Sequence, residues 1–143
     1  MTKANLENKL LAVVRVRGTV KVRQSIKETL NRLNLKHVNN MVLIQGTPSN
    51  LGMLKKCNDF VTYGPVNEEI VSKILQEKAA AAKPEFAKEL LEGKKSPKEL
   101  ALKMPFHMKP PRHGYEGVKY SFSVGGALGN RGEKISLLIK RML

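Results

Sequence analysis

Strand-like and helix-like hydrophobic patterns alternate over residues 10–65, and this alternation limits the fold more than any other feature of the sequence. Apolar residues alternate with Arg15 and Arg17, which predicts a first strand that ends at Gly18 and has one solvent-facing side. Over residues 22–34 the apolar residues recur every three or four positions, as they do on one face of a helix. The short apolar run that follows predicts a buried second strand.

The next part of the sequence predicts a second helix and a third strand. Thr47 is a suitable N-cap and Pro48 suits the first helical position, so we expect a helix that runs to about Cys57. Residues 59–64 predict the third strand. This order predicts an α+β fold, in which a small three-stranded antiparallel sheet forms a ferredoxin-like β-α-β-α-β unit with both helices on one face. Because each helix has a single apolar stripe, we expect the other face to be open to a partner.

Three regions are expected along the chain. The core domain would occupy residues 1–66, a helical appendage residues 67–104, and a basic extension rich in glycine and proline residues 105–143. Three helices are expected in the appendage, because Pro84 breaks its first apolar pattern and Ser96 begins a capping-box sequence.

The extension contains the stretch most suited to a polyanion. Residues 107–131 are rich in glycine, proline and cations and contain one acid, Glu116. Glycine lets a backbone approach a partner closely, proline stiffens the segment, and cations attract phosphate. An irregular surface loop with solvated charges is the alternative. Residues 118–124 alternate in polarity, which predicts an extended segment or an edge strand, and residues 133–143 predict a closing helix.

The charge of the whole chain points to an anionic partner. Twenty-six Lys and Arg residues against twelve Asp and Glu residues give a formal net charge of +14. Such an excess favours nucleic acid, with an anionic membrane surface as the rival partner. The cations are spread over two regions on either side of residues 67–82, which suits a broad contact surface. Few aromatic residues and no Trp favour contacts with phosphate and RNA shape over extensive base stacking.

Signals for other classes of protein are weak. Cys57 is the only cysteine, which excludes an intrachain disulfide, fits a reducing cytosolic setting, and suggests a small buried side chain. No apolar run has the length of a membrane span. The glycines of residues 125–129 do not have the spacing of a P-loop, and neither a zinc site nor a pair of catalytic carboxylates is evident. We therefore expect no enzyme activity, cofactor or metal; composition alone leaves a freestanding RNA-binding protein or RNA chaperone as an alternative.

Several motifs resemble the ribosomal protein thirty family of the large subunit. In the core domain these are Arg15-Val16-Arg17-Gly18, Thr47-Pro48, and Gly52-Met53 followed by Lys56. In the extension they are Pro110-Pro111-Arg112, Gly117-Val118-Lys119 and the sequence from Gly125 to Arg131. The extension is similar to that of the archaeal long form, which is related to eukaryotic large-subunit protein seven.

The resemblance implies a structural protein of the cytoplasmic ribosome that binds large-subunit ribosomal RNA near the 5S RNA and beside other ribosomal proteins. It implies no small-molecule substrate and no membrane. Many members have an arginine where Leu51 stands here, so we expect Lys55 or Lys56 to replace that contact. The residues expected to contact RNA are Arg15, Arg17, Gly18, Lys21, Arg23, Lys55, Lys56, Lys109, Arg112, His113, Lys119, Asn130, Arg131 and Lys134.

Overall fold

The computed structural model describes residues 9–18, 20–78, 88, 91, 106–115 and 117–142. The strands are β1 (Leu10–Arg15), β2 (Asn40–Gln45), β3 (Val61–Pro65), β4 (Phe106–His107), β5 (Gly117–Ser121) and β6 (Gly126–Asn130). The helices are α1 (Gln24–Arg32), α2 (Pro48–Lys56), α3 (Glu68–Lys78) and α5 (Ile135–Met142). Short 3-10 helices span Phe122–Val124 and Gly132–Lys134. Of the helices predicted after Pro84 and Ser96, the described residues include only Lys88 and Leu91, both helical; the rest lies outside them.

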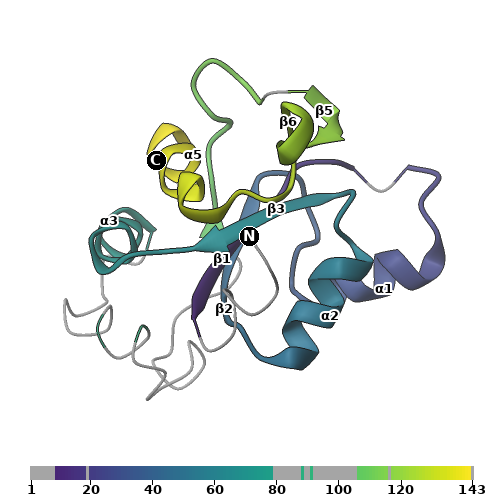
Figure 1. The fold of residues 1–143 in the computed structure, drawn as a ribbon, viewed down its shortest axis with the longest axis horizontal. Coiled ribbons are helices and arrows are strands. Elements are labelled where there is room, and N and C mark those ends of the chain that lie inside the picture. Colours follow the sequence, from purple (N-terminus) through teal and green to yellow (C-terminus); the bar gives the residue numbers. More distant parts are fainter. Residues whose placement is uncertain are drawn as a thin grey trace.

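The strands form one sheet in the order β4-β2-β1-β3-β6-β5 (Figure 1). β1 is the centre of an antiparallel unit, because it pairs antiparallel with both β2 and β3. This confirms the α+β class and the predicted antiparallel core. The prediction of only three strands is wrong: β4 extends the sheet beside β2, while β6 pairs parallel with β3 and β5 with β6. The open edges of β2 and β3 offer backbone hydrogen-bonding groups, and the C-terminal part of the chain pairs with them.

Helices α1 and α2 cover one face of the sheet, as predicted (Figure 1). The side-chain oxygen of Thr47 accepts a hydrogen bond from the backbone N–H of Asn50 at 3.3 Å, and Pro48 begins α2, which confirms the predicted cap. α1 is shorter than its predicted range of residues 22–34 and begins at Gln24. The core on this face includes Leu11, Val13, Leu30, Leu33, Leu35, Val42, Leu51, Leu54, Cys57 and Val61.

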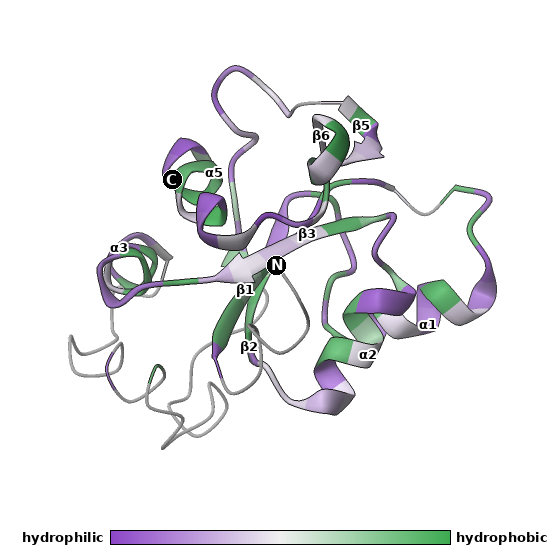
Figure 2. Ribbon diagram, viewed as in Figure 1, coloured by the Kyte–Doolittle hydropathy of each residue, from purple (hydrophilic) through white to green (hydrophobic). Residues whose placement is uncertain are grey.

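Helices α3 and α5 cover the opposite face, so the prediction of an open face is wrong (Figure 1). All six residues of β1 are buried, because its almost continuous apolar run has partners on both sides of the sheet. The hydropathy colouring shows apolar sides on both helices, and these sides supply the second core (Figure 2). Its members include Leu10, Ala12, Val14, Leu43, Ile70, Ile74, Ile135, Leu138, Ile139 and Met142.

The start of α5 lies directly against β3. A Cβ atom at Gly64 would collide with the carbonyl oxygen of Gly132 and come within about 3.0 Å of the Ile135 side chain. Glycine at position 64 therefore permits a close approach that any other residue would obstruct. The helix predicted over residues 133–143 is observed as a 3-10 turn followed by α5, with the predicted apolar side buried.

Candidate nucleic-acid interface

Three exposed or half-exposed cations lie between β1 and α1. Arg17 packs its guanidinium over the ring of Phe60, 5.4 Å from the ring centre, and donates to the backbone oxygen of Asp59 at 3.5 Å. Lys21 and Arg23 follow it on the surface, and Lys21 has a positive φ of 58°. Arg17 therefore attaches this cationic loop to the turn that follows α2.

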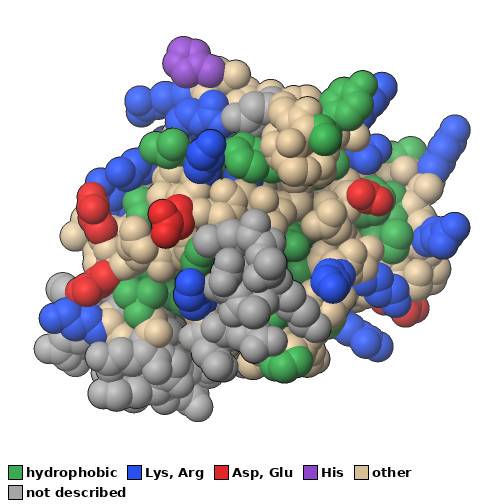
Figure 3. All heavy atoms as spheres, in the orientation of Figure 1, with side chains coloured by type: hydrophobic (Ala, Val, Ile, Leu, Met, Phe, Trp, Pro, Cys, Tyr) green, Lys and Arg blue, Asp and Glu red, His purple; other side chains and the backbone are tan. Residues whose placement is uncertain are grey.

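Lys55 and Lys56 stand exposed at the end of α2, directly before that turn. With Arg17, Lys21 and Arg23 they form a group that we term the α1–α2 cationic surface. The described first turns of α1 and α2 contain no acidic residue. Space-filling atoms show Lys and Arg side chains gathered around these helices (Figure 3).

Leu51, at the position where many family members have an arginine, does not reach the surface. Its side chain is buried in the core between α2 and the sheet. Lys55 and Lys56, in the last turn of the helix, are exposed to solvent. An RNA contact through position 51 is not available in this chain, whereas the two lysines remain suitably placed.

The expectation that Arg15 faces solvent is wrong. Its side chain is 2% exposed, and its guanidinium donates to the backbone oxygens of Leu35 at 2.8 Å and Arg17 at 2.9 Å. The segment between α1 and β2 closes over this end of β1, where Asn39 also donates its backbone N–H to the oxygen of Arg15. Burial lowers the pKa of Arg15 from its ordinary value. Arg15 thus holds the base of the cationic loop rather than its outer surface.

Arg131 is also inside the protein, contrary to the expectation of a surface contact. It is 5% exposed, and its Nε donates to the hydroxyl oxygen of Thr62 at 3.0 Å. A terminal nitrogen donates to the backbone oxygen of Ala127 at 3.4 Å, and the guanidinium lies 5.0 Å from the centre of the Phe122 ring. These contacts fasten the end of β6 to β3.

The loop of residues 108–115 carries three of the expected RNA-binding residues on the surface: Lys109, Arg112 and His113. Its turn is defined by positive φ angles of 65° at His113 and 73° at Gly114. The backbone N–H of Arg112 donates to the oxygen of Arg141 at 3.1 Å, which anchors the loop to α5.

Tyr115 anchors the other end of this loop. Its hydroxyl donates to Asn39 Oδ1 at 2.6 Å, and burial raises the pKa of Tyr115 to about 12. Lys119 is exposed on the edge strand β5. Gly18 is exposed in the first cationic loop, and Asn130 is half-buried, with its side-chain oxygen accepting from the N–H of Gly132 at 2.8 Å.

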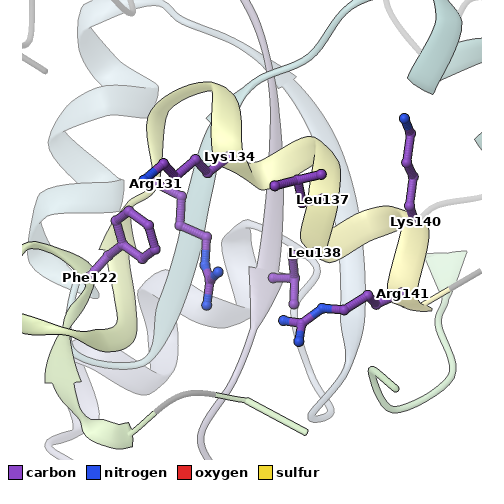
Figure 4. Close-up of a pocket in the computed structure, with 7 residues that line it drawn as sticks. All are labelled: Phe122, Arg131, Lys134, Leu137, Leu138, Lys140 and Arg141. Carbon is purple, nitrogen blue, oxygen red and sulfur yellow. The ribbon is translucent and has the colours of Figure 1, made fainter. Parts of the chain in front are cut away.

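A hollow of about 560 Å³ lies along the outer side of α5, and we term it the α5 hollow (Figure 4). Its apolar lining comes from Phe122, Leu137 and Leu138. Its cationic lining comes from Arg131, Lys134, Lys140 and Arg141. Of these residues, the sequence analysis singled out only Arg131 and Lys134 as contact residues. One signal in the sequence could have revealed the hollow. Leu137 is an apolar residue that lies off the buried side of the closing helix.

The described residues offer no catalytic or metal-binding cluster. Among them, no three His, Cys, Asp or Glu side chains gather in a way that could hold a metal ion. Cys57 is buried, and burial raises the pKa of its thiol to about 11, which keeps it protonated and poorly nucleophilic. In the part of the chain that the structure describes, every helix is too short or too polar to cross a membrane.

Comparison with known proteins assigns the chain to a family. Residues 11–61 match the family model described as ribosomal protein L30p/L7e. The large ribosomal subunit protein uL30 of Methanoculleus marisnigri is 39% identical over 152 residues, which cover 93% of this chain and 99% of that protein. The uL30 proteins of Nanoarchaeum equitans and Methanococcus maripaludis are 37% and 38% identical, covering 94% and 92% of this chain and 99% and 98% of their own lengths. The chain therefore belongs to the ribosomal protein L30p/L7e family and is a structural, non-enzymatic protein of the large subunit of the cytoplasmic ribosome.

Proposed function

We propose that this chain binds large-subunit ribosomal RNA, mainly through phosphate and 2′-hydroxyl groups, in the neighbourhood of the 5S RNA. The α1–α2 cationic surface is the observation that carries the proposal. It presents the cations of the β1–α1 loop and of the end of α2. A-form RNA displays phosphates and 2′-hydroxyls, while its deep, narrow major groove hides base edges from side chains.

The local electrostatics of α1 favour an anion. The backbone N–H groups give the start of a helix a partial positive charge, which acidic side chains commonly balance. In α1 the residue before the helix is Arg23, its side chain makes no cap, and the first turn has no acid. Phosphate groups would balance the positive charge that this arrangement leaves at the surface.

The loop of residues 108–115 provides a second contact region. Lys109, Arg112 and His113 are exposed, and the backbone of the loop is tied to α5. Because the loop is already held in place, less conformational entropy is lost when it binds. Lys119 extends this region onto β5. The position beside the 5S RNA and neighbouring ribosomal proteins is supported by the resemblance of the extension to the archaeal long form.

The test compares two double variants with the same change in charge. Lys21→Gln with Arg23→Gln removes two cations from the α1–α2 cationic surface, and Lys9→Gln with Lys73→Gln removes two exposed lysines elsewhere. Binding to large-subunit ribosomal RNA would be followed by filter binding from 50 to 200 mM salt. If about six or more phosphates are contacted, affinity should fall on the order of a thousandfold over this range.

We expect the first double variant to bind more weakly and to reduce the salt slope by roughly two, because two phosphate contacts are lost. The second should keep nearly the full slope. Identical behaviour of the two variants, or a flat salt response of the unsubstituted protein, would contradict the proposal. Cross-linking from a cysteine placed at Lys119 in assembled ribosomes would test the position near the 5S RNA; cross-links confined to distant RNA would refute that position.

A further inference from the structure

The α5 hollow has a pattern that a simple anion site does not require. Figure 4 shows Phe122, Arg131 and Lys134 at one end, Lys140 and Arg141 at the other, and two leucines between them. Leu138 is buried, whereas Leu137 is 62% exposed between two cationic ends. An exposed leucine in this position adds nothing to the binding of phosphate, but it can bury an apolar surface of a ligand.

The spacing of the cations fits a short anionic chain with a flat apolar group in its middle. Lys134 and Lys140 are six positions apart, which corresponds to about 9 Å along a helix axis. Long cationic side chains can reach inward from both ends. Arg141 points back along the hollow in Figure 4, and its guanidinium donates to the backbone oxygen of Arg112 at 3.4 Å.

The charge of the hollow supports a polyanion. Its lining residues include four cations and no acid. Acids near the hollow include Glu133, which precedes Lys134 in the 3-10 turn, and Glu69 on α3. The pKa of the Glu69 carboxyl group is lowered by its hydrogen bond with Lys73 and by the charges of Lys73 and Lys140. Glu69 also lies 3.2 Å from the ammonium group of Lys73, so its charge is shared between two lysines. The hollow therefore keeps a positive balance, with Lys134 exposed at the end away from α3.

We infer that the α5 hollow binds one unstacked nucleotide of single-stranded RNA, with its base against Phe122 and Leu137 and its flanking phosphates on Lys134 and on the Lys140–Arg141 end. Every nucleotide of a single strand has this order of anion, flat apolar face and anion, so the fit needs no special sequence. Aromatic and guanidinium groups are common supports for unstacked bases. The Phe122 ring already lies 5.0 Å from the guanidinium of Arg131 and 5.5 Å from the ammonium of Lys134. The inference rests on the proposed RNA binding and adds to it a site that recognises a base rather than the backbone.

The test uses two RNA pentamers that differ in one base. One is pentaadenylate, and the other has an abasic nucleotide at its centre, so both carry the same phosphates. Fluorescence anisotropy with the full chain would give both dissociation constants. Because stacking of one base contributes substantially to binding, we expect pentaadenylate to bind at least about fivefold more tightly.

Two variants locate the effect in the hollow. Leu137→Ser should abolish the preference for pentaadenylate, and Lys134→Gln should weaken both pentamers to the same extent. Val38→Ser is the matched control, since Val38 is an exposed apolar residue that does not line the hollow, and it should keep the preference. If Leu137→Ser does not fold, the affinities of the unsubstituted protein for the two pentamers still show whether a base is recognised.

Four outcomes would overturn the inference. Equal affinity for the two pentamers would show that no base is recognised, and the proposed function would still stand if ribosomal RNA binds with the expected salt dependence. A preference that survives Leu137→Ser would place the base elsewhere. Tighter binding of a short peptide with Asp on both sides of a leucine, in competition with pentaadenylate and abolished by Leu137→Ser, would assign the hollow to a protein partner instead. Loss of all RNA binding would remove both proposals.

Discussion

Arg131 donates from its Nε atom to the hydroxyl oxygen of Thr62 at 3.0 Å, and this contact joins the end of β6 to β3. The same hydroxyl donates to the backbone oxygen of Gly129 at 3.0 Å. Arg131 and Thr62 are both buried. Removing the guanidinium therefore takes away the buried donor to the Thr62 hydroxyl oxygen. We expect Arg131→Met to lower the free energy of unfolding by about 1–3 kcal/mol, as measured by urea denaturation.

Arg112→Met is the matched control for Arg131→Met. The Arg112 side chain is exposed, and the hydrogen bonds that tie this residue to Arg141 use its backbone. The thermal midpoint should therefore stay nearly unchanged, while affinity for ribosomal RNA should fall. A comparable loss of stability in both variants would show that the two arginines have the same structural role, contrary to their burial.

Arg15 provides a second test of an arginine that acts inside the protein. Arg15→Lys keeps a positive charge, but a single ammonium group cannot reproduce the two hydrogen bonds to Leu35 and Arg17. We expect a loss of about 2 kcal/mol in unfolding free energy, measured by urea denaturation. Arg17→Lys, at a half-exposed position, should change stability by less than about 0.5 kcal/mol. If the two variants lose equal stability, the burial of Arg15 does not determine its contribution.

Two glycines give opposite expectations for the same substitution. Gly64→Ala places a methyl group against the backbone of Gly132, so we expect a loss of about 3 kcal/mol or more, or failure to fold. Gly52 lies in α2 with no atom within 4 Å of an added Cβ, and Gly52→Ala should stabilise the protein by about 0.5–1 kcal/mol. Thermal unfolding would measure both effects, and a tolerated Gly64→Ala would mean that α5 can move away from β3 at little cost.

Cys57 should make stability depend on pH above 9. Burial raises the pKa of the folded thiol from about 9 to about 11, so the folded state holds its proton more tightly than the unfolded chain. Its contribution is fully present below the unfolded pKa and is lost as the pH rises from about 9 to about 11. The loss should reach about 3 kcal/mol once the pH is above both pKa values.

Urea denaturation at pH 8 and pH 10.5 would measure this effect. In Cys57→Ala the fall between the two pH values should be smaller, and what remains should reflect other groups such as Tyr115, whose pKa burial also raises. An equal fall in the substituted and unsubstituted proteins would exclude the thiol as its source.

Local patterns predicted the elements that depend on local chemistry. The Thr47–Pro48 start of α2 followed from capping geometry, and the buried side of α5 followed from helical periodicity. The long-range strand pairings could not be predicted from such local patterns. For example, the pairing of Thr62 in β3 with Gly129 in β6 leaves no periodic signal in either segment. For the same reason the second layer, formed by α3 and α5, was missed.

The candidate site was predictable only in part. A cation in a sequence looks the same whether it faces water or a backbone oxygen, so Arg15 and Arg131 could not be told apart from Arg17 and Arg112. The sequence therefore identified the cationic loops but not which arginines hold them in place. The α5 hollow was missed because Phe122 and Leu137 line the same hollow only after the segment around β6 and α5 has folded.

The position of α5 in the second core has a consequence for the order of synthesis. Strands β1, β2 and β3 and helices α1 and α2 are complete once residue 65 has been made. One face of their sheet is covered by α3 and by α5, and α5 ends only at Met142. Until the ribosome has released nearly the whole chain, Leu10, Ala12 and Val14 lack part of their covering. The nascent protein thus carries a partly uncovered apolar sheet face until α5 has been made, and such transiently exposed apolar surface favours aggregation.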